Sequence, residues 1–185
     1  MKLAIGAAVS ALTTLSLLTH ALAAPTPAPD PALAVMAPST SFNLKLASSD
    51  RRVDGKCAST YHTGAGFNDM VVGACDPAAP RSFALNPTDS SKIDYLGFGA
   101  TTPSQVQAYD GLASYEVWAK VVANAGLSGT EFTYSESEGF LQKGTGLGFL
   151  ACRWSHYNSW QLFALSREPD GFPLSCARVA LKKSF

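Results

Sequence analysis

The chain alternates between short apolar runs and turn-forming residues over most of its length. The segment from Phe42 to Leu46 has apolar side chains at every second position, which is the pattern of a strand with one buried face. Similar runs follow at residues 57–62, 70–73, 82–85, 93–98, 106–109, 115–122, 131–135, 139–142, 148–154, 160–166 and 177–182. The 15 glycines and 11 prolines of the chain supply turns. The pattern predicts an antiparallel all-β domain.

One segment, residues 113–125, also fits a helix. It carries Tyr115, Trp118 and three valines, and β-branched and aromatic side chains favour a strand. We therefore expect a strand here, and no helix of ten or more residues anywhere in the domain.

The twelve runs divide into three groups of four, and each group closes on alternating apolar residues. These are Phe83 and Leu85, then Phe132 and Tyr134, then Val179 and Leu181. Three four-stranded units favour a β-trefoil-like fold or a closed barrel. A β-sandwich or an up-and-down barrel is the alternative, because it explains nearly the same string of strands.

The N-terminus has the pattern of a secretory signal peptide. Lys2 precedes an apolar run from Leu3 to Leu18, and Ala21-Leu22-Ala23 is a small-x-small cleavage site. Residues 24–40 contain five prolines and predict an extended leader that cannot build a core. We therefore expect a signal peptide at 1–23, a Pro-rich leader at 24–40 and a secreted, extracellular all-β domain at 41–185.

Four cysteines allow three disulfide connectivities. We favour Cys57–Cys75 and Cys152–Cys176, because each pair brackets a local strand-turn-strand segment. A zinc site would need closer cysteine spacing and a reducing compartment, so we expect no metal and no cofactor.

The charge balance limits the classes of partner. The chain has 14 basic and 14 acidic residues, and removal of Lys2 with the signal peptide leaves about one net negative charge. The chain has no stripe of basic residues, so we expect no nucleic-acid partner. The signal peptide is the one long apolar segment, so we expect no membrane span in the mature protein.

The first candidate site is the segment from Tyr61 to Asp69. Tyr61, His62 and Asn68 are expected to bind a ligand, and His62 with Asp69 is a candidate catalytic pair, since histidine exchanges protons near neutral pH. The alternative is a tight turn in which Gly64 and Gly66 have positive φ and His62 hydrogen-bonds the backbone.

The second candidate site is the segment from Cys152 to Trp160. The side chains of Trp154, His156, Tyr157, Asn158 and Trp160 could form a platform for a sugar or a protein, and His156 is a further catalytic candidate. The alternative places Trp154 and Trp160 in the core on opposing strands, with the loop between them.

A third segment carries two carboxylates, Glu136 and Glu138, two positions apart. A glycosidase needs such a pair across a cleft, but neighbouring exposed glutamates are common. His62 and His156 are the only histidines of the expected mature chain, so a Ser-His-Asp triad would have to use one of them. The chain also lacks the Gly-x-Ser-x-Gly motif of a nucleophilic serine.

Five motifs carry a resemblance that spans about residues 42–182. They are Tyr61-His62-Thr63-Gly64-Ala65-Gly66 with Asn68-Asp69, Phe83-x-Leu85-Asn86, Cys152-x-Trp154-x-His156, Gln161-Leu162-Phe163 and Ser175-Cys176-Ala177-x-Val179-x-Leu181. Together they resemble an uncharacterised family of small secreted proteins from filamentous fungi. The resemblance implies a fungal extracellular protein and supports the Cys152–Cys176 pairing. It implies no catalytic residue, because none is established in that family.

Three hypotheses of function follow. The first is a non-enzymatic binding or effector-like protein whose extracellular ligand is a carbohydrate or a protein. The second is a small extracellular hydrolase that uses His62 or His156 with a carboxylate. The third is a protease inhibitor that inserts the cysteine-bracketed segment 58–74 into a protease.

Overall fold

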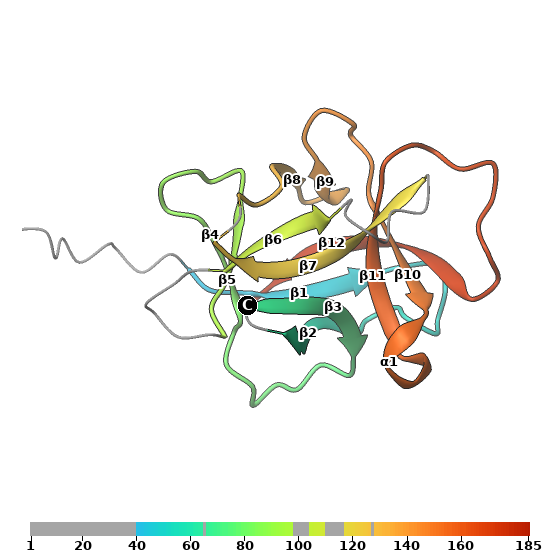
Figure 1. Ribbon diagram of the computed structural model, residues 1–185, viewed down its shortest axis with the longest axis horizontal. Coiled ribbons are helices and arrows are strands. Elements are labelled where there is room, and N and C mark those ends of the chain that lie inside the picture. Colours follow the sequence, from blue (N-terminus) through green and yellow to red (C-terminus); the bar gives the residue numbers. More distant parts are fainter. Residues whose placement is uncertain (1–39, 65, 98–103, 110–116, 127) are drawn as a thin grey trace, which may run out of the picture. The chain divides into compact units, whose positions relative to one another are not determined.

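The computed structural model describes residues 40–64, 66–97, 104–109, 117–126 and 128–185, apart from the side chains of Ser155 and Tyr157. The predicted signal peptide and all but the last residue of the predicted leader lie outside the described residues. The described residues form twelve strands and one helical turn (Figure 1). They are β1 (Asn43–Ala47), β2 (Cys57–Gly64), β3 (Phe67–Gly73), β4 (Phe83–Leu85), β5 (Ile93–Tyr95), β6 (Ser104–Tyr109), β7 (Trp118–Ala125), β8 (Phe132–Ser135), β9 (Gly139–Gln142), β10 (Phe149–Arg153), α1 (Ser155–Asn158), β11 (Trp160–Leu165) and β12 (Cys176–Ser184).

Each of the twelve predicted runs contributes a strand, so the all-β prediction is confirmed. The ambiguous segment forms β7 from Trp118 onward, and its first four residues lie outside the described part. The strands of the described residues pair antiparallel, in one sheet that runs β4-β5-β6-β7-β11-β3-β2-β1-β12-β9-β8, with β10 between β11 and β12.

The strand pairings repeat three times along the chain, as a β-trefoil-like fold requires. The hairpins β2–β3, β6–β7 and β10–β11 correspond to one another, and β3, β7 and β11 each pair with the other two. The pairs β4–β5, β8–β9 and β12–β1 also correspond. A bridge between Phe42 and Phe83 and a hydrogen bond from the amide of Phe132 to Ser91 carry the sheet further round, so it is partly closed into a ring.

Alternation along the strands separates an inner face from an outer face. Inner-face side chains form the main core, which includes Phe42, Leu44, Met70, Val121 and Leu162. On the outer face a smaller apolar cluster forms from Leu150, Cys152, Phe163, Leu165 and Cys176. The sheet is therefore covered by apolar side chains on one face and only in part on the other.

Both predicted disulfides are confirmed. Cys57 and Cys75 join the start of β2 to the chain just after β3. Cys152 and Cys176 occupy directly opposed positions on β10 and β12, inside the outer-face cluster. Among the described residues, no helix has the length and apolar character needed to cross a membrane.

Candidate functional site

A buried carboxylate lies at the centre of the outer face. The side chain of Asp69 on β3 is only 3% exposed, yet it points away from the main core. The Nζ of Lys120 on β7 donates to both carboxylate oxygens, at 3.0 and 3.2 Å. The Nε2–H of His156 on α1 donates to Oδ2 at 2.7 Å. We call Asp69, Lys120 and His156 the polar cluster.

The strand register explains how this cluster assembles. Asp69 is opposite Tyr61 on β2 and opposite Val122 on β7, so Lys120 lies two residues along β7 on the same face. A carboxylate buried without partners would be strongly destabilising, and the two donors satisfy it. The polar cluster is thus held by three elements that are far apart in sequence.

The turn that carries His156 has an unusual backbone. His156 and Asn158 have φ values of 56° and 62°, in the left-handed region that favours glycine, although asparagine and histidine tolerate it better than most residues. The backbone carbonyl of His156 accepts hydrogen bonds from the amide and hydroxyl of Ser159. These bonds and the contact with Asp69 hold His156 in this conformation.

Tyr61 completes the site. Its ring lies 4.2 Å from the His156 ring, centroid to centroid, at an interplanar angle of 33°. Tyr61 is 43% exposed, whereas the carboxylate beneath is buried. The result is an exposed aromatic ring whose neighbour is fixed by a buried ion pair.

Trp154 lies at the far end of the same row of side chains. It is 45% exposed and packs edge-on against Phe163, with ring centroids 6.2 Å apart. Phe163 on β11 is directly opposite Lys120 on β7. A row across the outer face therefore joins Tyr61 to Trp154 through Asp69, Lys120 and Phe163.

His62 is not part of this row. Neighbouring side chains on a strand point to opposite faces, so His62 faces away from Tyr61. Its Nδ1–H donates to the Oδ1 of Asn68, at 3.2 Å, rather than to Asp69. The structure therefore pairs Asp69 with His156, and the predicted pair of His62 and Asp69 does not form.

Trp160 also lies apart from the row. It is 4% exposed and belongs to the main core, where the guanidinium groups of Arg52 and Arg153 lie 5.2 and 5.1 Å from its ring centroid. The expected two-tryptophan platform is therefore corrected: Trp154 is at the surface, and Trp160 is buried because β11 turns it inward. Asn158 is exposed on α1, and the side chain of Tyr157 lies outside the described part.

Two other expectations change with the structure. Residues 58–74, expected as an exposed, rigid loop that inserts into a protease, form the β2–β3 hairpin, with most residues paired in the sheet. Glu136 and Glu138 lie in the turn between β8 and β9, and the backbone carbonyl of Glu136 accepts from the Nζ of Lys182. The segment 58–74 is therefore mostly strand rather than loop.

Lys120 was not among the residues expected at the site. It lies in the strand Trp118–Ala125, where most neighbours are alanine or valine, and a lone lysine within a buried strand was the available signal. The partners of Asp69 are 51 and 87 residues away along the chain, so no motif contains them.

The polar cluster can orient a histidine and present an aromatic surface. The His156 ring hydrogen-bonds the carboxylate of Asp69, and no hydrogen bond joins it to a hydroxyl of the described side chains. The described residues also contain no group of three or more His, Cys, Asp or Glu side chains that could hold a metal ion. Binding is the chemistry that these contacts support directly.

Comparison with known proteins gives a family but no activity. No curated protein and no solved structure matches the chain. A family model described as a domain of unknown function, DUF7907, matches residues 39–185, which include every described strand. The chain therefore belongs to the DUF7907 family.

Proposed function

We propose that this protein is a secreted fungal binding module that holds a carbohydrate on its outer face. The observation that carries the proposal is the exposed ring of Tyr61, held 4.2 Å from His156 above a buried carboxylate. Sugar rings pack on exposed aromatic faces, and a ring that is already ordered loses little conformational entropy on binding.

The two ends of the row suit an extended ligand that contacts both of them, rather than a ligand held at one point. Tyr61 and Trp154 offer two exposed aromatic surfaces, and Lys120, with a side chain 22% exposed, lies between them as a hydrogen-bond donor. Export is supported by the N-terminal pattern and fits the two disulfides, since disulfides persist in oxidising compartments.

The test is a saccharide array probed with the wild-type chain and three variants. Tyr61→Ala and Trp154→Ala should each weaken binding about tenfold, the range expected for an aromatic contact at the centre of an interface. Phe172→Ala is the matched control, because Phe172 is equally exposed at 41% but lies in the segment between β11 and β12. Failure of the wild-type chain to bind any saccharide, or equal losses in all three variants, would contradict the proposal.

A small hydrolase is the second candidate, and the 2.7 Å contact between His156 and Asp69 favours it. In that case His156 acts as a base that Asp69 orients. Turnover of an ester or glycoside substrate that disappears in His156→Gln, but persists in His62→Gln, would support it. If the wild-type protein binds saccharides but turns over no substrate, the hydrolase is rejected and the binding module remains the proposed function.

A further inference from the structure

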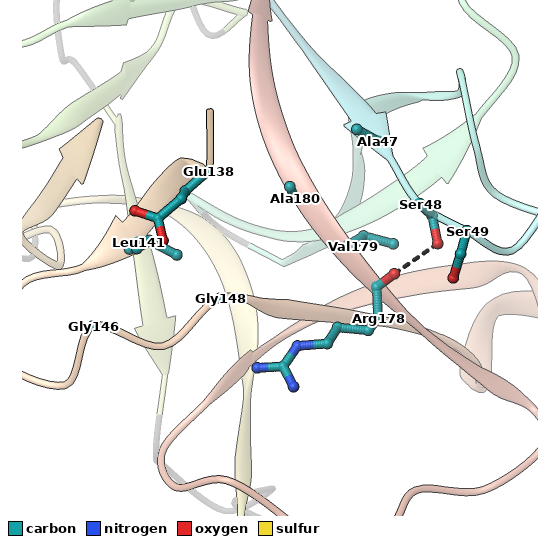
Figure 2. A pocket seen from close by; sticks show the side chains of 10 residues that line it. All are labelled: Ala47, Ser48, Ser49, Glu138, Leu141, Gly146, Gly148, Arg178, Val179 and Ala180. Atoms are coloured by element: carbon teal, nitrogen blue, oxygen red, sulfur yellow. Dashed lines mark hydrogen bonds between the residues drawn. The ribbon is translucent and has the colours of Figure 1, made fainter. Parts of the chain in front are cut away.

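A second site lies on the outer face of β12, away from the polar cluster. A groove of about 390 Å³ is lined by ten residues from four segments: Ala47, Ser48, Ser49, Glu138, Leu141, Gly146, Gly148, Arg178, Val179 and Ala180. Figure 2 shows Glu138 beside Leu141 on one side of β12 and Ser48 with Ser49 on the other. Its volume falls within the range of small-molecule sites.

Small side chains create the groove. Ala47 on β1 and Ala180 on β12 are directly opposed in the sheet, so two methyl groups form its floor. The turn after β9 contributes Gly146, with φ of 67°, and Gly148, neither of which carries a side chain that could fill the space. Larger side chains at these positions would occupy the space above the sheet and fill the groove.

The charges of the groove leave one carboxylate without a partner. The guanidinium of Arg178 forms a two-pronged ion pair with Glu168, with Nη2 to Oε2 at 2.8 Å, and this bond lowers the pKa of Glu168 below its usual value. The hydroxyl of Ser48 donates to the backbone carbonyl of Arg178 at 2.6 Å. Glu138 forms no ion pair with any described residue, so its carboxylate remains available to a ligand.

We propose that this groove binds a primary ammonium group, with Glu138 as its counter-ion. A compact cation can approach the small-residue floor from the Glu138 side of β12 and be held there by the carboxylate. An amino sugar and a lysine side chain both carry such a group. The site does not depend on the proposed saccharide site around Tyr61.

The test is calorimetric titration of the full chain with three probes: a glucosamine trimer, an N-acetylglucosamine trimer and N-acetyl-lysine amide. At least one of the two probes with a free amine should bind, and the neutral trimer should not bind at this site. Binding of the glucosamine trimer alone identifies an amino-sugar site, and binding of the lysine amide alone identifies a peptide side-chain site. Either result supports the proposal.

Three variants locate the binding. Glu138→Gln should weaken it about tenfold, since one charge-assisted hydrogen bond is lost. Glu136→Gln is the matched control, because it removes the same charge from the same turn outside the groove, and it should have no effect. Ala180→Leu should block binding by filling the floor while all charges remain.

Three results would overturn the proposal: no binding of either amine, equal losses in the two glutamate variants, or unchanged binding in Ala180→Leu. Tyr61→Ala should leave amine binding intact. A loss there would assign the amine to the other site, so failure of this proposal is distinguishable from failure of the saccharide proposal.

Discussion

The two faces of β3, β7 and β11 bury different kinds of side chain although they share one backbone. The inner face carries Met70, Val121 and Leu162, which meet in the main core. The outer face carries Asp69 and Lys120, which meet in an ion pair. The inner face is stabilised by non-directional apolar contacts, whereas each charged group of the polar cluster on the outer face needs a particular partner. Recognition of a ligand is expected on the second kind of surface.

The outer-face disulfide gives the largest expected effect. Replacing Cys152 and Cys176 by serine should lower the free energy of unfolding by about 4 kcal/mol, from lost chain constraint and from polar atoms introduced into the smaller apolar cluster. Replacing Cys57 and Cys75, which lie nearer the surface, should cost about 3 kcal/mol. Urea unfolding measures both, and the reverse order would show that the outer cluster adds nothing.

Truncation of a side chain on the inner face tests how much the apolar contacts of the main core stabilise the fold. Leu162→Ala should lower the free energy of unfolding by about 3 kcal/mol, because it leaves a cavity in the main core. Leu174→Ala is the control, since Leu174 is 93% exposed and should change stability little. A loss below about 1 kcal/mol at Leu162 would mean that the core repacks.

Variants of the polar cluster test whether the outer face depends on particular partners. Asp69→Asn should cost about 2 kcal/mol, because Lys120 and His156 both lose their charged acceptor in a buried position. Lys120→Met should cost less, since its side chain is partly exposed and His156 still satisfies the carboxylate. Thermal unfolding of the two variants gives the order. Equal stability of Asp69→Asn and wild type would mean that the outer face, like the inner one, does not depend on particular partners.

The ion pair of Arg178 with Glu168 should give the smallest effect, because both side chains are about half exposed. The hydrogen bond from Arg178 lowers the pKa of Glu168, so the folded state binds that proton less readily than the unfolded state. Its contribution to stability is therefore present above the ordinary value of 4.5 and is lost as pH falls through the lower folded value. Glu168→Gln should flatten this part of the stability–pH curve, and an unchanged curve would contradict the assignment.

Alternation of apolar residues predicted the inner face well. The run from Phe42 to Leu46 became β1 with Leu44 and Leu46 buried, because every second side chain points to the same face. Local spacing also gave both disulfides, since each closes a segment of neighbouring strands. These features depend on contacts that are short in sequence or periodic.

The outer face could be predicted only in part. Tyr61, Asp69 and His156 were singled out, but the polar residues Asn68 and Asp69 suggested a loop where β3 already begins at Phe67. Their pairing depends on the register of β3 with β7 and on the left-handed turn at His156, neither of which leaves a local pattern. Composition could not show which of Trp154 and Trp160 is buried. Alternation assigns each side chain to a face only when the ends of the strands are known.

The most direct test of the account is an NMR titration of the labelled full chain with the saccharide that binds best on the array. The account predicts that the aromatic signals of Tyr61, Trp154 and His156 shift together while those of Phe172 and the buried Trp160 stay in place. Shifts confined to Phe172, or shifts in the core without any at Tyr61, would contradict a ligand site on the outer face.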